Sequence, residues 1–447
     1  MERGRREGPM PSDSRGGLAR LALGYGPGRI ELDYDPARFA VLAPAASDPP
    51  ELSDAALAAR LDAPLGSAPL GALVGTRDRV CIVVPDATRA SASDRVAGLL
   101  LDCLAALGLR DAQVEFVVGG GTHRAPTPEE IVRIVGSKAA RRVAVHRHDA
   151  TDASSHARVA TTSRGTPVEI NRRLVEADRV LLVGAIGFHY FAGFSGGRKG
   201  LLPGCGSDRA IQTNHLLAFD RTTLSRAPGV ESGRLDGNPV NEDLEEAARL
   251  FGPTFLVNTV LDPAQRIVAL YAGDWRTAHR RGCADYLETH SVSVAERRPV
   301  VVVSCGGAPR DINMIQSHKA LEHARLVLED GGDLVLLAQC AEGLGRPDFL
   351  DWFVPGGARA IARKLVEDYK VYGQTAWGIR WKSERYRVRL VSSLDPEVVR
   401  RMGMIPHASL GEALAAVPKG RGYLIPYGLG TLPILAEQRT RRAGGAG

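Results

Sequence analysis

Two histidines and a lysine lie in glycine-rich loops at the ends of predicted strands. His123 lies in GGGTHR (119–124), and His189 and Lys199 lie ten residues apart in GFHYFAGFSGGRKG (187–200). An imidazole can donate or accept a proton near neutral pH, so a pair on opposite sides of a substrate could exchange protons with either face. Arg198 precedes Lys199, and a neighbouring cation disfavours the ammonium form, which would make this amine a better nucleophile. The alternatives are histidines that only bind backbone and a solvated Arg–Lys pair at a turn.

The glycines at 193, 196, 197 and 200 surround this lysine. Because glycine has no Cβ, they leave room for a bulky group to approach the backbone. The loop is not a P-loop, since arginine stands where GxxxxGK needs its second glycine and no Ser or Thr follows the lysine.

Other side chains are suited to an anion or a metal. Arg89, in PDATR, could clamp a carboxylate or phosphate with two hydrogen bonds. Gln316 and Lys319 share one face near the start of a predicted helix, where the helix dipole also favours an anion; a solvated face is the alternative. His215 could ligate a metal through an imidazole nitrogen, although a lone helix histidine is more often structural. No HExxH, EF-hand or Cys/His ligand cluster occurs, so a metal held by protein atoms alone is not expected.

Short β-branched runs alternate with amphipathic segments and would position these residues. RVCIVV (79–84), AQVEFVVGG (112–120) and ADRVLLVGAI (177–186) read as buried strands, each followed by one of the polar loops. In an open parallel sheet the carboxyl ends of the strands line one edge, where ligands bind. We therefore expect Asp86, Arg89, His123, His189 and Lys199 to converge.

Capping residues predict where several helices begin. Ser93 starts the segment SDRVAGLLLDCLAAL, Thr127 and Glu130 form a capping box, and Ser207 and Asp311 are expected as caps of later helices. The alternation favours an α/β fold with largely parallel sheets.

A second strand–helix series begins near Ala295, and the segment 291–299 is the best candidate for a domain boundary. We predict a disordered basic tail (1–18), an N-terminal α/β cofactor-binding domain (19–291) and a C-terminal α/β domain (292–420). Residues 421–447 are expected to return to the N-terminal domain and to end in a disordered tail.

Composition excludes several classes of protein. The net charge is +6, but much of the excess lies in Gly/Arg-rich tails and no basic patch is interleaved with aromatics, so nucleic-acid binding is not expected. Six scattered cysteines without a CxxC pair fit a reducing cytosol. No signal peptide and no run of eighteen apolar residues occurs, so we expect a cytoplasmic protein that does not bind a membrane.

Several ordered motifs together resemble the lactate racemase family, which depends on a nickel-pincer nucleotide. From roughly residue 20 to 430 they are DATR, GGGTHR, FHYFAGFSGGRK, NH at 214–215, DGNPVNED and QSHK. The resemblance implies two α/β domains with the active site in the interdomain cleft. It also implies a cofactor, nickel(II) pyridinium-3,5-bisthiocarboxylic acid mononucleotide, and partners that include the enzymes of its biosynthesis.

Site residues follow from the resemblance motif by motif. Lys199 matches the lysine bonded covalently to the cofactor, and His215 matches the histidine that ligates nickel. The nucleotide-binding D-x-T-R matches Asp86, Ala87, Thr88 and Arg89.

The implied reaction is racemisation or epimerisation at C2 of a 2-hydroxy acid by reversible hydride transfer to that cofactor. His123 and His189 match the two proton-transferring histidines, while Gln316 and Lys319, together with Arg89, would hold the substrate. Lactate, malate, aryl-lactates, other short hydroxy acids and sugar acids are all candidate substrates. No oligomeric state is predicted.

Three other functions compete with this one. A nicotinamide-dependent 2-hydroxyacid dehydrogenase would need a GxGxxG turn after the first strand, and DATRASAS has no such glycines. A non-catalytic relative that only binds the cofactor would need Lys199 and His215 but neither His123 nor His189. A Schiff-base lyase using the lysine would not explain His215.

Overall fold

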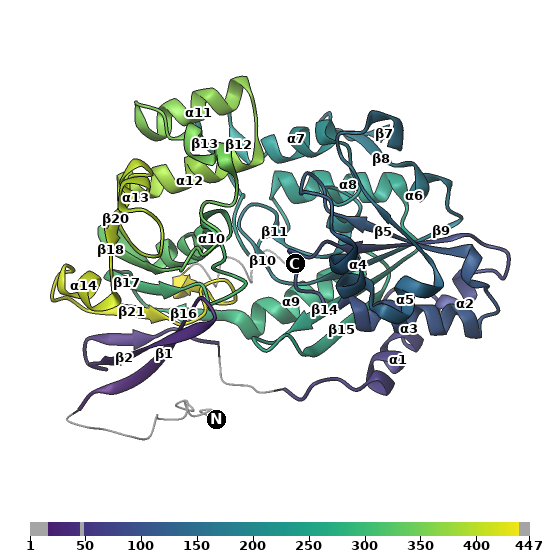
Figure 1. Cartoon of the computed structure of the whole chain (residues 1–447), viewed down its shortest axis with the longest axis horizontal. Coiled ribbons are helices and arrows are strands. Elements are labelled where there is room, and N and C mark those ends of the chain that lie inside the picture. The colour runs from purple at the N-terminus through teal and green to yellow at the C-terminus, as the bar shows by residue number, and fades with distance from the viewer. Residues whose placement is uncertain (1–16, 45–48, 438–447) are drawn as a thin grey trace. The chain divides into compact units, whose positions relative to one another are not determined.

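A computed structural model describes residues 17–44 and 49–437 of the chain (Figure 1). Internal contacts divide the chain into two units. The central unit comprises Asp48–Asp220 and Arg226–Tyr286, and the terminal unit comprises Met1–Ser47, Arg221–Ser225 and Leu287–Gly447. Most of the two predicted tails lies outside the described residues. Within the described part of the chain, no helix is both long enough and apolar enough to cross a membrane.

The central unit is built on a six-stranded sheet with the strand order β15-β14-β9-β4-β5-β6, in which only the β14–β15 pair is antiparallel. Its strands are β4 (Val80–Pro85), β5 (Val114–Gly119), β6 (Ala144–Arg147), β9 (Arg179–Ala185), β14 (Phe255–Leu261) and β15 (Ile267–Gly273). Runs such as VCIVV are buried throughout, as expected for parallel strands covered on both faces.

Helices and short ribbons complete this unit (Figure 1). The core joins strand residues such as Ile82 and Phe116 to Leu100 and Leu104 of helix α3. The helices are α1 (Asp54–Asp62), α2 (Leu70–Leu73), α3 (Ser93–Ala106), α4 (Pro128–Val135), α5 (Ser137–Arg142), α6 (Arg172–Glu176), α7 (Asp208–Leu216), α8 (Pro239–Phe251) and α9 (Thr277–His290). The ribbons pair β7 (His156–Thr161) with β8 (Pro167–Asn171) and β10 (Phe188–His189) with β11 (Gly193–Phe194). A further two-residue pair, β12 (Phe219–Asp220) with β13 (Ser225–Arg226), flanks the segment Arg221–Ser225, which is assigned to the terminal unit.

The terminal unit contains a second six-stranded sheet, which is parallel throughout and has the order β20-β19-β18-β17-β21-β3. Its strands are β3 (Phe39–Val41), β17 (Arg298–Ser304), β18 (Leu328–Leu337), β19 (Arg387–Val391), β20 (Ile405–His407) and β21 (Gly422–Ile425). An antiparallel ribbon, β1 (Ala19–Tyr25) with β2 (Gly28–Tyr34), and a parallel pair, β16 (Ser291–Val294) with β22 (Leu432–Leu435), accompany it. The helices are α10 (Met314–Ala324), α11 (Gly357–Glu367), α12 (Val371–Arg385), α13 (Pro396–Arg401) and α14 (Leu410–Ala415).

The predicted α/β fold with mostly parallel sheets is confirmed, but two domain limits are wrong. Residues 421–435 do not return to the N-terminal domain, because β21 pairs with β17 and with β3 inside the terminal unit. Residues 19–44 likewise belong to the terminal unit rather than to a domain 19–291. Local periodicity identifies a strand but carries no information about its partner, so both ends of the chain were assigned to the wrong sheet.

Helix starts were predicted well with one exception. Ser93 begins α3, Thr127 and Glu130 form the expected capping box, and Ser207 caps α7. Asp311 does not cap α10, because its carboxylate accepts from the backbone N–H groups of Gly26 and Gln339. Asn313 is the cap, and its side chain accepts from Gln316 N.

Candidate active site

Three of the polar loops follow three adjacent strands of the central sheet. β9, β4 and β5 are neighbours and run parallel, so their carboxyl ends lie at one edge. The chain proceeds from β4 to β5 and β6 on one side and later to β9 and β14 on the other, so β4 marks the topological switch point where ligands bind in such sheets. The loops also touch each other, since Gly121 N donates to Gly204 O at 2.9 Å. The loops that carry Asp86, Arg89, His123, His189 and Lys199 thus lie at one edge of the sheet.

The first feature at this edge is an acid–imidazole pair. Asp86, which is buried, accepts from His123 Nδ1 at 2.8 Å through Oδ2 and from Thr88 N and Oγ1 through Oδ1. Burial by itself raises the pKa of Asp86, but the hydrogen bond and charge of His123, with Arg89 and Thr88, lower that pKa far below its usual value. The ionised carboxylate therefore holds the proton on His123 Nδ1 and leaves the lone pair on Nε2. The His123 side chain is 36% exposed, which suits an imidazole that meets a substrate.

His189 is held in the opposite tautomer. It ends β10, and its Nδ1 accepts from Ala192 N at 3.3 Å. A backbone N–H can only donate, so neutral His189 carries its proton on Nε2. The two histidines thus differ at Nε2, where His123 presents a lone pair and His189 presents a proton.

Phe191 is the centre of an aromatic cluster that joins three predicted site residues. Its ring centroid lies 4.4 Å from that of His189 and 4.8 Å from that of His215, and Lys199 Nζ lies 5.5 Å from it. Burial, with the charge of Lys199, holds the pKa of His215 well below its usual value, so this imidazole is neutral and able to donate a lone pair. Lys199 Nζ and the His215 ring therefore lie beside the same aromatic ring.

A buried arginine holds the loop that carries Lys199. Arg198 is 1% exposed, and its guanidinium donates to Ala192 O at 2.9 Å, Phe194 O at 3.3 Å and Gly196 O at 3.4 Å. Burial lowers its pKa to about 10, so the guanidinium remains charged at neutral pH. The interpretation as a solvated Arg–Lys pair is therefore wrong.

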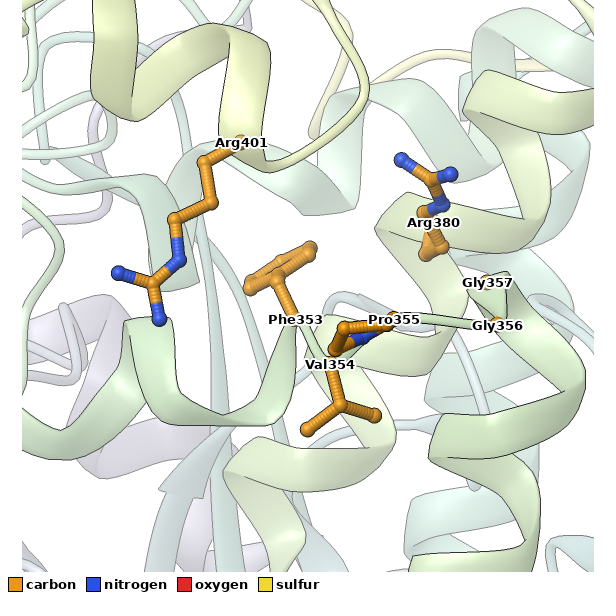
Figure 2. A pocket seen from close by; sticks show the side chains of 7 residues that line it. All are labelled: Phe353, Val354, Pro355, Gly356, Gly357, Arg380 and Arg401. Atoms are coloured by element: carbon orange, nitrogen blue, oxygen red, sulfur yellow. The ribbon is translucent and has the colours of Figure 1, made fainter.

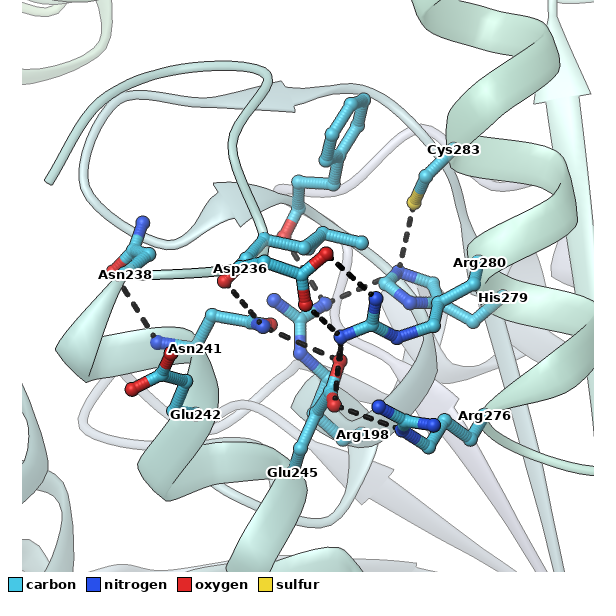
Figure 3. A network of polar contacts seen from close by, with 12 residues as sticks. Arg198, Asp236, Asn238, Asn241, Glu242, Glu245, Arg276, His279, Arg280 and Cys283 are labelled. Atoms are coloured by element: carbon cyan, nitrogen blue, oxygen red, sulfur yellow. Dashed lines mark hydrogen bonds and ion pairs between the residues drawn. The ribbon is translucent and has the colours of Figure 1, made fainter. Parts of the chain in front are cut away.

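Helix α9 packs against the same loop (Figure 3). His279 Nε2 lies 3.1 Å from Arg198 Nη1 and 2.9 Å from Ser195 O. A Cβ on Gly197, where φ is +57°, would lie 2.6 Å from the His279 ring. The space that a Cβ would take is likewise occupied at Gly196 by the Asn258 side chain and at Gly193 by the Arg234 backbone. These three glycines thus allow the protein to pack on itself, whereas the sequence suggested room for a ligand.

Carboxylates and arginines surround this buried layer (Figure 3). Glu245 of α8 binds Arg276 and Arg280, and Arg280 also binds Asp236. Asn238, the cap of α8, donates to Phe191 O at 3.0 Å. The DGNPVNED segment (236–243) is therefore part of the scaffold beneath the loop.

The remaining predicted site residues lie in the terminal unit. Helix α10 follows β17, the strand at which the order of the second sheet reverses. Lys319 Nζ donates to Gln316 Oε1 at 2.6 Å, which confirms that the two share one helical face. A cavity of about 440 Å³ elsewhere in this unit is lined by Phe353, Val354, Pro355, Gly356, Gly357, Arg380 and Arg401 (Figure 2). None of the predicted site residues lines it.

Sequence reasoning missed three contributions. Asp86, which the resemblance assigns to the nucleotide, also accepts from His123, and the sequence did not predict this partner. Ala87, Thr88 and Arg89 are the exposed part of that loop. Sequence reasoning also missed the central position of Phe191 and the clamp formed by Arg198. An Asp two residues before a Thr is a signal for a local Asx turn, but a partner 37 residues away leaves no local pattern.

Comparisons with known proteins identify the relatives of this chain. The model of the lactate racemase N-terminal domain matches residues 25–225, and that of the C-terminal domain matches residues 294–423. The lactate racemase of Thermoanaerobacterium thermosaccharolyticum is 30% identical over 409 residues, covering 89% of this chain and 94% of that protein. The lactate racemase of Lactiplantibacillus plantarum is 29% identical over 394 residues, covering 83% of this chain and 89% of that protein.

Solved structures extend the comparison. The lactate racemase apoprotein from T. thermosaccharolyticum superposes with a TM-score of 0.86 at 28% identity, covering 93% of this chain and all of that chain. A Thermotoga maritima protein, with a TM-score of 0.66 at 20% identity, covers 87% of this chain and 99% of its own and shares the fold. Together with the matches of both domains, these relatives show that the chain belongs to the lactate racemase family of isomerases.

Proposed function

We propose that this protein interconverts the two configurations at C2 of a small 2-hydroxy acid. The observation that carries the proposal is the pair of imidazoles with opposite tautomers at one sheet edge, His123 and His189. His123 Nε2 has a lone pair that can accept the hydroxyl proton, and His189 Nε2–H provides a donor. A racemase needs a proton acceptor and a proton donor in either direction, and these two residues supply both.

The residues of the central unit also fit a nickel-pincer nucleotide. Among the described residues, no group of three or more His, Cys, Asp or Glu could hold a metal ion, so His215 would be a lone protein ligand that depends on donors supplied by a cofactor. Lys199 lies beside the ring of Phe191, which also contacts His215, and would attach the cofactor covalently. When bound, such a cofactor supplies a centre that takes up and returns a hydride.

The protein's own residues would then perform three tasks. Lys199 and His215 hold the cofactor, while the exposed Arg89 and the half-buried Lys319 bind anionic groups such as the substrate carboxylate. Gln316, bonded to Lys319, orients its ammonium group. His123 and His189 handle the hydroxyl proton, so the chain itself moves protons only.

The state of the cysteines bears on the cellular compartment in which the protein acts. All six cysteines are free, and five of them are buried. Free thiols fit a reducing compartment, so we propose that the protein acts in the cytoplasm.

The decisive experiment uses protein produced together with the enzymes that synthesise the cofactor. A chiral assay against single enantiomers of lactate, malate, aryl-lactates and sugar acids should reveal interconversion of at least one pair. Peptide mass spectrometry should find the added mass on Lys199, and protein from a host without the pathway should be folded but inactive. Interconversion by nickel-free protein, or an unmodified Lys199 in active holoenzyme, would contradict the proposal.

Two variants test the roles of the histidines. His123→Ala and His189→Ala should each reduce interconversion by about 10²–10⁴-fold, the usual contribution of a general acid or base. His146→Ala is the matched control, because His146 pairs with Glu115 on the sheet and has no role in the proposed proton transfer. Turnover within a few-fold of wild type in either site variant would refute the two-histidine assignment.

A further inference from the structure

The DGNPVNED segment contains a buried carboxylate that the proposed chemistry does not use. Asp243, in the first turns of α8, is 0% exposed. A buried carboxylate is costly unless both of its oxygens accept hydrogen bonds, so its partners reveal what it is there to hold.

Both oxygens of Asp243 accept from fixed donors. Oδ1 lies 2.5 Å from Thr162 Oγ1, and that hydroxyl itself accepts from Thr166 N at 3.0 Å. The hydroxyl hydrogen is therefore directed at Asp243. Oδ2 accepts from Asn214 Nδ2 at 2.8 Å. With donors on both sides, Asp243 is held as an acceptor only.

The amide of Asn214 can then have only one orientation. Its Nδ2 faces two acceptors, Asp243 Oδ2 at 2.8 Å and Val240 O at 3.2 Å, so a flipped amide would place its oxygen against both. The amide oxygen must therefore face His215, whose Nδ1 lies 3.1 Å away. An amide oxygen only accepts, so His215 Nδ1 must carry a proton.

We propose that Asp243, acting through Asn214, is the positioning residue that fixes His215 in the tautomer with its proton on Nδ1 and its lone pair on Nε2. This tautomer is a property of the protein alone, whereas its consequence for nickel rests on the proposed function. A neutral imidazole binds a metal through the nitrogen without a proton, and a partner on the other nitrogen fixes which one that is. Where the cofactor supplies the other donors, the tautomer of this one imidazole controls whether the protein contributes a ligand.

Both acceptors of the Asn214 amide belong to helix α8. Val240 and Asp243 lie one turn apart at the start of α8, whose cap, Asn238, also binds Phe191 O. Phe191 in turn packs its ring against His215 at 4.8 Å with an interplanar angle of 65°. One helix end thus sets both the tilt and the tautomer of the ligand.

The first test uses apoprotein, so it requires neither the cofactor nor bound nickel. In apoprotein labelled with ¹⁵N-histidine, the signals lost in His215→Gln identify this ring, and its nitrogen shifts report the tautomer. The expected result is a protonated Nδ1 and an unprotonated Nε2 at neutral pH. A proton on Nε2 in wild-type apoprotein would overturn the proposal, whatever the protein's activity.

The second test uses Asp243→Asn, with Glu246→Gln on the same helix as the matched change from carboxylate to amide. The new amide can donate to Asn214 Oδ1 and compete for the opposite orientation, so Nε2–H should become populated at His215. Nickel per chain is then measured after dialysis in protein co-expressed with the cofactor's biosynthetic enzymes. Asp243→Asn should retain less nickel than wild type, corresponding to a roughly 10–100-fold weaker affinity, whereas Glu246→Gln should retain the wild-type content.

Thermal unfolding of both variants verifies that they are folded. A folded Asp243→Asn protein with unchanged tautomer and unchanged nickel content would overturn the proposal. If wild-type protein shows the expected tautomer but retains no nickel, the hydrogen-bond relay is upheld and the proposed function fails. The two ideas can therefore be refuted separately.

Discussion

Arg198 offers the sharpest test of how this site is assembled. Its buried guanidinium donates the hydrogen bonds that water would otherwise give to the backbone carbonyls of the loop that carries Lys199. In Arg198→Met the carbonyls of Ala192, Phe194 and Gly196 lose their donor. Only the 2.9 Å contact has an ideal length, so we assign it about 2 kcal/mol and the two longer contacts roughly 0.5 kcal/mol each. The local loss is then about 3 kcal/mol.

An opposing effect acts on the stability of the whole unit. Burial lowers the pKa of Arg198 from its ordinary value to about 10, which corresponds to a cost of roughly 3 kcal/mol for the charge. Methionine removes this cost, so the two contributions nearly cancel in the free energy of unfolding. Local openings that break these hydrogen bonds while the side chain stays buried do not recover this cost, so the defect must be measured locally.

Hydrogen exchange followed by mass spectrometry provides that measurement. The amides of Ser195, Lys199 and Leu202 bond within the loop and should exchange about 10²-fold faster in Arg198→Met, since 1.4 kcal/mol is a factor of ten. Peptides from β5 serve as the internal reference, and Arg249→Met, a surface change with the same chemistry, is the control variant. Exchange of these amides within threefold of wild type, with β5 unchanged, would refute the clamp.

Three further predictions concern single residues. Asp86→Asn removes the carboxylate that holds the proton on His123 Nδ1 and should lower kcat by about 10²-fold without changing the unfolding midpoint by more than a few degrees; wild-type kcat would contradict it. His148, whose pKa burial lowers to about 4, is neutral in the folded protein, so its stabilisation is complete above pH ~6.5 and is lost as the pH falls toward 4, by about 1.4 kcal/mol per pH unit. Urea midpoints between pH 7 and 4.5 should therefore fall less steeply for His148→Gln, and equal slopes would be evidence against this assignment. Lys319→Met should raise KM about tenfold or more with a smaller effect on kcat, and an unchanged KM would exclude Lys319 as a carboxylate ligand.

The sequence contains enough local information for most elements and for the edge at which the site lies. Buried runs, caps at Thr127 and Ser207, and polar loops after strands are all short-range patterns, and each was confirmed. The polar face shared by Gln316 and Lys319 was likewise predictable from helical spacing.

What could not be predicted depends on contacts between distant segments. Nothing next to Asp243 indicates that Asn214 will reach it, and Arg198 reads as a surface residue until α9 packs on its loop. The assignment of β21 to the wrong sheet has the same origin, because pairing partners are chosen by the whole fold.

The strand order of the terminal unit has a consequence for biosynthesis. β3 and β21 are neighbours in one sheet although about 380 residues separate them along the chain. At roughly 5–20 residues per second, the ribosome needs about 20–80 s to deliver the second strand after the first. The central unit can be complete by then, while β3 still lacks β21, its one partner in the sheet among the described strands. A nascent chain that stalls before residue 422 would thus leave an early segment unpaired, which makes this interval the time when chaperones matter most.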